Sequence, residues 1–365
     1  MTIFFSQSNV LIPVAGTSFP VTGSAPKLTA YEWLAWRFCR DWLTGKENFT
    51  LHTSGSTGTP KPIILTRQQM AASARMTGRA LGLQPGDAAL VNLNVQYIAG
   101  MMMLVRGLEL GLNLTILEPS ATPLAGLPTE TTFDFQSYVP LQLQAMLEQT
   151  PGKIPILSRA KAILVGGAPV SADLENRLQA IAAPVYQTYG MTETVSHVAL
   201  RRVNGPERRG LYSALDTIFF STDPRNCLVI HAPQLNPEPV ATNDVVELLS
   251  PTTFRWLGRA DNVINSGGVK VLAEKVEAAV ETVFARQKIG RRFFVTGLPH
   301  PQLGEAVTLV VEGETFAPAT QTSVLQSIAA MLARYEAPKS ILFVPQFTET
   351  PTGKLDRIRT AGQLP

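Results

Sequence analysis

The segment from Thr53 to Lys61 contains the residue types needed to bind a triphosphate. It reads Thr-Ser-Gly-Ser-Thr-Gly-Thr-Pro-Lys and lies between a short apolar strand and a capped helix. Glycines let the backbone approach a phosphate closely, while hydroxyls and loop amides donate hydrogen bonds. The spacing differs from a Walker loop, and a flexible linker is the plain alternative. We expect phosphate contacts from Thr53, Ser54, Gly55, Ser56, Thr57, Gly58 and Lys61.

Two further positions could serve the same chemistry. Thr192-Glu193 offers a hydroxyl and a carboxylate, and Mg²⁺ takes few protein oxygens beside those of a substrate phosphate. Lys354 follows Gly353 and could neutralise charge that grows during phosphoryl chemistry. Taken alone, a Thr-Glu pair more often begins a helix, and a single lysine is usually a solvated surface residue. Their roles are therefore predicted only from the surrounding motifs.

Ordered motifs along nearly the whole chain resemble the adenylate-forming superfamily, which includes acyl- and aryl-CoA synthetases, peptide-synthetase adenylation domains and luciferases. The matching stretches are Thr53–Lys61, Val165–Ala168, Tyr186–Thr194, Asp244, Gly258–Asp261, Gly267–Lys270 and Pro351–Arg357. One departure precedes Asp244, where Thr242-Asn243 stands in place of the usual Thr-Gly. Asparagine tolerates left-handed backbone better than most residues, so the turn can persist.

This resemblance implies an enzyme that activates a carboxylic acid with ATP as an acyl-adenylate and transfers the acyl group to coenzyme A. ATP, Mg²⁺ and coenzyme A are the implied cofactors and substrates. The implied catalytic residues are Lys354, Glu193 and Thr192, with Glu193 and Thr192 at the metal. The implied nucleotide contacts are Gly166, Gly167, Ala168, Tyr189, Gly190, Asp244 and Arg259. In the superfamily, the residue matching Tyr189 stacks on adenine and the one matching Asp244 binds the ribose.

The resemblance also implies a change of domain orientation between the two half-reactions. Asp261 matches the hinge about which the smaller domain turns. One orientation presents the Lys354 loop for adenylation. The other presents the segment containing Gly267, Gly268 and Lys270 for thioester formation.

The acid is suggested by Gln96–Gly107, which resembles the substrate region of o-succinylbenzoate–CoA ligases of menaquinone biosynthesis. Arg106 falls six residues after Gly100, as in that family, although Tyr97 and Ala99 replace the usual His and Ser. A second carboxylate on the acid would need a cation inside an apolar pocket. We expect substrate contacts from Arg106, Gly100 and Tyr97, although a helix-surface position is the alternative for Arg106.

Other functions stay open from the sequence. The acid could differ, so that the chain is another aryl- or acyl-CoA ligase or one that loads a carrier protein. A non-catalytic nucleotide-binding homologue is a further alternative, which the intact motif residues disfavour. The four histidines form no triad-like cluster, so no histidine is assigned to catalysis.

The elements that position these residues alternate between strand and helix as far as residue 188. Strands are expected at 88–93, 114–117, 160–165 and 185–188, and helices at 67–82, 98–110 and 172–182. This alternation predicts parallel βαβ units with helices on both faces of a sheet. After residue 257 the pattern predicts a hairpin at 262–271, helices at 273–287 and 323–333, and strands at 293–296, 307–311 and 341–344.

We therefore predict an α/β fold of the acyl-CoA synthetase type with two domains. A large N-terminal domain of layered α/β sheets, 1–258, would hold ATP and the acid. A smaller, mobile α+β domain, 259–365, would carry the catalytic lysine.

Composition is compatible with small substrates. The chain has 365 residues, 45% of them hydrophobic, and a net charge of +3 without a basic run of the kind that binds nucleic acid. The apolar runs are too short to span a bilayer, and the N-terminus has no secretory pattern. Cys39 and Cys227 match no metal or redox spacing. We expect a cytoplasmic protein without membrane insertion, and the sequence leaves a homo-oligomer open.

Overall fold

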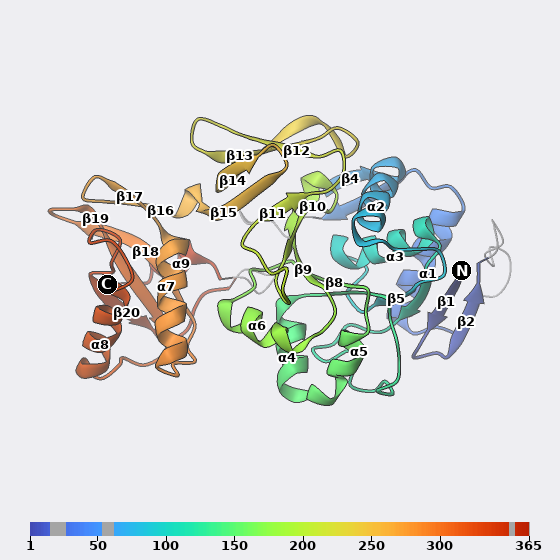
Figure 1. The fold of residues 1–365 in the computed structure, drawn as a ribbon, viewed down its shortest axis with the longest axis horizontal. Coiled ribbons are helices and arrows are strands. Elements are labelled where there is room, and N and C mark those ends of the chain that lie inside the picture. Colours follow the sequence, from blue (N-terminus) through green and yellow to red (C-terminus); the bar gives the residue numbers. More distant parts are fainter. Residues whose placement is uncertain (15–26, 53–61, 350–354, 365) are drawn as a thin grey trace.

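The computed structural model describes residues 1–14, 27–52, 62–349 and 355–364 (Figure 1). The described chain forms two α/β units, a large one built on a 13-stranded sheet and a smaller one on a 5-stranded sheet. Figure 1 shows the smaller unit at the end of the molecule opposite the N-terminal strands. The predicted fold class is confirmed.

One half of the large sheet is parallel, as the strand–helix alternation predicts. Its neighbours run in the order β9-β8-β7-β5-β6-β1 and pair parallel throughout. The strands are β1 (Thr2–Phe5), β5 (Ala88–Val91), β6 (Asn113–Ile116), β7 (Phe135–Tyr138), β8 (Ala162–Val165) and β9 (Val185–Gly190). The edge strand β2 (Val10–Pro13) pairs antiparallel with β1.

The other half is antiparallel, which the sequence analysis did not predict. It begins where β10 (His197–Arg202) pairs antiparallel with β9. The remaining strands are β11 (Tyr212–Ala214), β12 (Phe219–Thr222), β13 (Cys227–Ala232), β14 (Asn236–Ser250) and β15 (Thr253–Arg259). Short connections between neighbouring strands suffice for antiparallel pairing, so no helix separates them.

Helices cover both faces of the parallel half, because its strands bury apolar side chains on each side. One core joins the sheet to α1 (Ala30–Leu43), α2 (Arg67–Leu81) and α3 (Ile98–Leu110). The opposite core joins it to α4 (Pro140–Gln149), α5 (Ile154–Ser158) and α6 (Ala172–Arg177). Short 3₁₀ turns occupy Pro151–Lys153, Leu178–Ala180 and Thr192–Thr194.

Local signals fix the ends of α1 and α2. Thr29 and Glu32 form a capping box at the start of α1, and Thr66 and Gln69 form one at the start of α2. Each box satisfies backbone N–H groups that the first helical turn leaves free. The left-handed Gly82, with φ of +64°, ends α2 as the sequence predicts. Both boxes can be recognised in the sequence, as Thr29-Ala30-Tyr31-Glu32 and Thr66-Arg67-Gln68-Gln69.

A two-stranded antiparallel sheet frames the glycine-rich segment. β3 (Asn48–His52) pairs with β4 (Pro62–Thr66), and His52 lies opposite Pro62. The described residues on either side of 53–61 therefore lie side by side. β4 leads directly into α2, so this sheet is joined to the helix that packs beside α3.

The smaller unit has strand order β17-β16-β19-β18, with β20 parallel to β19. Its strands are β16 (Val263–Ser266), β17 (Val269–Leu272), β18 (Phe293–His300), β19 (Gly304–Glu312) and β20 (Ser340–Val344). Its helices are α7 (Ala273–Arg286), α8 (Pro318–Ala329) and α9 (Arg357–Ala361), and a 3₁₀ turn at Ala260–Asn262 precedes β16. The helix expected at 323–333 lies earlier, because Pro318 occupies its first turn.

The predicted division after residue 258 falls one residue before the end of β15. Arg259 still pairs with Asp244 in the large sheet, whereas β16 already belongs to the small one. Motion of the second unit as a separate domain stays a prediction.

Candidate nucleotide and acid site

Those of the predicted nucleotide contacts that the structure describes gather near the carboxyl ends of β8 and β9. In doubly wound sheets, ligands bind outside this edge of the parallel strands. Gly166 follows β8, and a Cβ atom built there would lie 2.1 Å from Oγ1 of Thr188 on β9. Gly167 has φ of +83°, a conformation that favours glycine, and Ala168 is exposed. The glycines thus let this segment lie close to β9, while Ala168 faces solvent.

Tyr189 at the end of β9 is bonded to Asp244. Its hydroxyl donates to Oδ2 of Asp244 at 2.6 Å, and its ring packs edge-on against Phe254 with centroids 5.1 Å apart. Burial and the neighbouring Asp244 carboxylate raise the pKa of Tyr189, so the phenol stays protonated and donates. Asp244 is buried, with 6% of its surface exposed. The structure therefore joins two of the predicted nucleotide residues directly.

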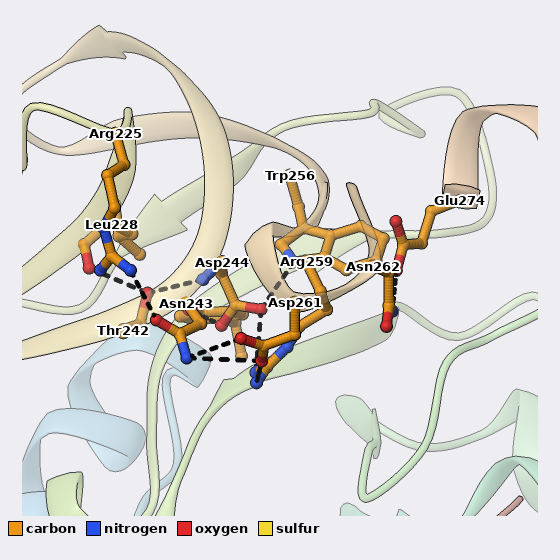
Figure 2. A network of polar contacts seen from close by, with 11 residues as sticks. Arg225, Leu228, Thr242, Asn243, Asp244, Trp256, Arg259, Asp261, Asn262 and Glu274 are labelled. Carbon is orange, nitrogen blue, oxygen red and sulfur yellow. Dashed lines mark hydrogen bonds and ion pairs between the residues drawn. The ribbon is translucent and has the colours of Figure 1, made fainter. Parts of the chain in front are cut away.

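Two further donors reach the other oxygen of Asp244 (Figure 2). Nε1 of Trp256 lies 3.2 Å and Nη1 of Arg259 lies 3.4 Å from Oδ1. Nη2 of Arg259 also donates to Oδ2 of Asp261 at 2.9 Å. Arg259 thus links the expected ribose residue to the expected hinge. The contact of Trp256 with Asp244 could not be predicted from the sequence, because it depends on the pairing of β14 with β15.

Thr192 and Glu193 form the 3₁₀ turn that follows Gly190 and Met191. The side chain of Glu193 is exposed and that of Thr192 half-buried. A Cβ atom built on Gly190 would lie 2.3 Å from the carbonyl oxygen of Ser196, so glycine is needed where the turn folds back. An exposed carboxylate beside a hydroxyl fits Mg²⁺, which needs one or two protein oxygens when phosphate supplies others. No cluster of three or more His, Cys, Asp or Glu side chains suited to a metal occurs among the described residues.

The next residue, Val195, holds a strained backbone conformation. Its φ is +66° and ψ is −53°, and the amide of Ser196 donates to the carbonyl of Thr194 at 2.7 Å. These values describe a γ-turn of the rare, strained form, which is unusual for a β-branched residue. Val195 is fully buried, so packing maintains the strain. The turn directs the chain from Glu193 into Ser196 and His197.

Ser196 and His197 contact Arg106 of α3. Nη2 of Arg106 donates to Oγ of Ser196 at 2.7 Å and lies 3.4 Å from Nδ1 of His197, while Nε donates to Oγ1 of Thr77 at 3.3 Å. Nη1 has only the weak acceptor Met103 Sδ, at 3.8 Å, among the described residues. Arg106 is 2% exposed. It lies in the interior, and the alternative of a helix-surface residue is excluded.

The electrostatics of this cluster are unusual. Within the described ranges, no ion pair includes Arg106, and burial lowers its pKa to about 9. Burial, together with the Arg106 charge, lowers the pKa of His197 well below its ordinary value, so the imidazole is neutral. Since Nδ1 faces the guanidinium, Nε2 carries the proton and donates to Oγ1 of Thr77 at 3.1 Å. Among the residues that the structure describes, this buried cation therefore has only neutral partners.

The other residues predicted to contact the acid lie at the start of α3. A Cβ atom on Gly100 would lie 2.4 Å from the carbonyl oxygen of Asn94, so Gly100 allows α3 to pack against the segment before it. Tyr97 precedes the first helical residue and is 57% exposed. The described structure thus places Tyr97 at the surface, away from the buried position of Arg106.

The residues predicted to act as the hinge and in thioester formation lie at the start of the small unit. Asp261 lies in the 3₁₀ turn after β15, and Gly267 and Gly268, with φ of +60° and +81°, make the turn between β16 and β17. Lys270 on β17 is exposed. The predicted residues Thr53, Ser54, Gly55, Ser56, Thr57, Gly58, Lys61 and Lys354 lie outside the described residues.

Known proteins that resemble this chain in sequence include AMP-binding enzymes and CoA ligases. The family of AMP-binding enzymes matches residues 47–224. A probable 2-succinylbenzoate–CoA ligase of Mycobacterium tuberculosis is 30% identical over 322 residues, covering 84% of this chain and 81% of the relative. A 2-succinylbenzoate–CoA ligase of Geobacillus is 26% identical and is covered over 68% of its length.

Two solved structures resemble this fold over most of the chain. An acyl-CoA synthetase (AMP-forming)/AMP-acid ligase II-like protein from Dyadobacter fermentans is 46% identical with a TM-score of 0.64, covering 96% of this chain and 98% of that one. The o-succinylbenzoate CoA synthetase of Bacillus subtilis, in complex with OSB-AMP, is 21% identical with a TM-score of 0.71, over 85% of this chain and 68% of that one. At 21% identity, the similarity to the Bacillus subtilis enzyme shows that the two chains share a fold and nothing about the substrate. No helix in the described ranges is long and apolar enough to cross a membrane.

Proposed function

The chain belongs to the family of AMP-binding, adenylate-forming enzymes, and on this premise we propose that it is a ligase joining 2-succinylbenzoate to coenzyme A. ATP, Mg²⁺ and coenzyme A are the proposed co-substrates and cofactor, and menaquinone biosynthesis is the proposed pathway. The proposed activity releases pyrophosphate when the acid joins AMP, and AMP when the thiol replaces it. The relatives named above support this acid.

One observation carries the choice of acid: the buried Arg106 guanidinium with only neutral partners among the described residues. Removing a charge from water costs free energy. An anion that binds beside the Arg106 guanidinium offsets part of this cost. An acid with two carboxylates suits this, because one is consumed by adenylation while the other keeps its charge. The N–H groups of Nη1, which face only a thioether in the described residues, are the donors still open to that carboxylate.

The remaining residues have complementary proposed roles. Asp244 accepts hydrogen bonds from the ribose, and Tyr189 supports the adenine. Glu193 and Thr192 would hold Mg²⁺, which supplies positive charge against the phosphates. Lys354 neutralises charge at the reacting α-phosphate, and the hydroxyls and amides of 53–61 bind the leaving pyrophosphate. No protein nucleophile is needed, because the thiol attacks an already activated acyl group.

The function is tested by measuring pyrophosphate release with ATP, Mg²⁺ and a panel of acids. We expect 2-succinylbenzoate to give a kcat/KM at least about 100-fold above that of benzoate, because a lone carboxylate leaves Arg106 unpaired. A medium-chain fatty acid and a small dicarboxylate complete the panel. Equal rates with benzoate would reject the assignment of the acid, and absence of AMP formation with every acid would favour a non-catalytic role.

The apparent affinity for 2-succinylbenzoate should decline at high pH. The guanidinium is charged below its pKa of about 9 and binds the carboxylate, and it loses its proton above that value. Affinity should therefore be constant from neutral pH to about 9 and then fall roughly tenfold per pH unit. Isothermal titration with the acid measures this. Benzoate is the control, since its binding lacks the second carboxylate and should not follow the same profile.

Replacing Asp244 with asparagine should raise the KM for ATP about 10- to 100-fold, because hydrogen bonds to a charged acceptor contribute about 1.5–3 kcal/mol. Asparagine keeps the size of the side chain but removes the charge that Tyr189 and Arg259 face. The matched control is Asp216→Asn, whose side chain is 60% exposed and pairs with Arg79. Initial-rate kinetics of pyrophosphate release measure both variants, and equal KM values for ATP would remove Asp244 from the nucleotide site.

A further inference from the structure

Asn243 stands where the adenylate-forming resemblance expects glycine, and its side chain forms contacts that a glycine could not. Nδ2 donates to Oδ1 and Oδ2 of Asp261 at 3.1 and 3.3 Å (Figure 2). Nη1 of Arg225 donates to Oδ1 of Asn243 at 3.2 Å. The amide oxygen of Asn243 must face the Arg225 guanidinium, and its nitrogen must face the Asp261 carboxylate, so the orientation of the side chain is fixed. Arg225 is itself held by Asp223 at 2.8 Å.

Asp261 is thus held from two directions. Asn243 reaches it from β14, and Arg259 reaches it from the end of β15. Both belong to the large sheet. The next residue, Asn262, instead donates to Oε1 of Glu274 on α7 at 2.5 Å, within the small unit. The 3₁₀ turn at Ala260–Asn262 is therefore one place where side-chain contacts pass from one unit to the other. A second lies between α7 and α6, where Glu281 bonds Ser171 and Ala172.

These contacts stabilise one orientation of the small unit relative to the large sheet. In Figure 1 the β16–β17 hairpin extends away from the large sheet. Its turn residues, Gly267 and Gly268, are exposed. Under the proposed function, thioester formation needs this hairpin at the nucleotide site. The orientation that Asn243 and Arg259 stabilise is therefore not the one that forms the thioester.

We propose that Asn243 is a positioning residue that slows the change from acyl-adenylate formation to thioester formation by holding Asp261. It acts through Asp261 and touches neither substrate. Arg259 holds the same carboxylate but also contacts Asp244, so only Asn243 can be removed without disturbing the expected ribose residue. This inference rests on the proposed function for its half-reactions, but not on the identity of the acid.

The first test separates the half-reactions in Asn243→Ala. Adenylation is followed by pyrophosphate release without coenzyme A, and thioester formation by mixing preformed acyl-adenylate enzyme with coenzyme A. Asp261 is 55% exposed, so these hydrogen bonds are modest, and we expect thioester formation to quicken roughly 3- to 10-fold. Adenylation should change less than about twofold. Equal changes in both steps, or none, would overturn the proposal.

A double-mutant cycle tests the route of action. If Asn243 acts through Asp261, Asn243→Ala should have no further effect on thioester formation in an Asp261→Ala background. Additive effects of the two changes would show that Asn243 acts elsewhere, and the proposal would fail. Asn243→Asp keeps the size but places a carboxylate against Asp261, so it should alter thioester formation in the same direction as Asn243→Ala.

A structural readout keeps this test separate from the proposed function. Glu207→Cys and Arg286→Cys place spin labels on exposed positions of the two units, while the native Cys39 and Cys227 are buried. Electron–electron distance measurements on the full chain without substrates should show one dominant separation with Asn243, and a second population in Asn243→Ala. Unchanged distances would overturn the proposal, whereas inactivity with every acid beside shifted distances would reject only the proposed function.

Discussion

Replacing Lys354 with alanine is expected to slow acyl-adenylate formation by about 100- to 1,000-fold. This is the range found when one preorganised group that stabilises transition-state charge is removed. The expectation rests on the resemblance of Pro351–Arg357, since Lys354 lies outside the described residues. Thioester formation from added acyl-adenylate should keep its rate, because the phosphate chemistry is then complete. Single-turnover measurement of each half-reaction checks the result.

A matched control for this variant is Lys270→Ala. Lys270 is an exposed lysine of the same unit, on the hairpin assigned to thioester formation. It should leave adenylation unchanged and slow thioester formation. If both lysine variants lost the same half-reaction, the assignment of two separate roles to these segments would be wrong.

Arg106→Ala should raise the KM for 2-succinylbenzoate about 100-fold and leave the KM for ATP within about twofold. The charged hydrogen bonds to the second carboxylate account for about 2–3 kcal/mol, which corresponds to this factor. Initial rates at varied acid and ATP measure both constants. Benzoate serves as the control acid, because its KM should respond far less. An unchanged KM for 2-succinylbenzoate would remove Arg106 from the acid site.

Thermal unfolding distinguishes a binding role from a structural one. Arg106 has only neutral partners among the described residues, so Arg106→Met, which keeps much of the volume, should not lower Tm in the absence of acid. Added 2-succinylbenzoate should raise Tm of the unmodified protein and not that of the variant. A large fall in Tm without ligand would mean that the guanidinium mainly holds Ser196 and Thr77 in place.

The parts of the fold with strong local signals could be predicted from the sequence. Thr29, Thr66 and Gly82 mark helix ends because capping depends on a few adjacent residues. The antiparallel strands β10–β15 were not predicted. Several of their pairings contain register shifts, for example between Val245 and Val246, which interrupt the alternation that signals a strand.

Some residues of the candidate site could likewise be predicted from the sequence, and others could not. Arg106 and Asp244 were singled out because their surrounding segments resemble the family's motifs, and their roles stay predictions. The neighbours Thr77, Ser196 and Trp256 could not be predicted, since a hydroxyl or an indole has no distinctive spacing and tertiary packing alone brings it there. Tyr97 was expected in the acid site from sequence position, but its side chain is exposed at the start of α3.

The strained turn at Val195 has a thermodynamic consequence. Residues 192–197 join the expected metal residues to the neighbours of Arg106 through a buried turn with little conformational freedom. Because this turn leaves the backbone little freedom, a displacement of Thr192 by a bound nucleotide would be expected to move Ser196 as well. By reciprocity, whatever factor ATP adds to the affinity for the acid, the acid must add to the affinity for ATP. If the turn couples the two sites, ATP and the acid would therefore bind cooperatively, each by the same factor.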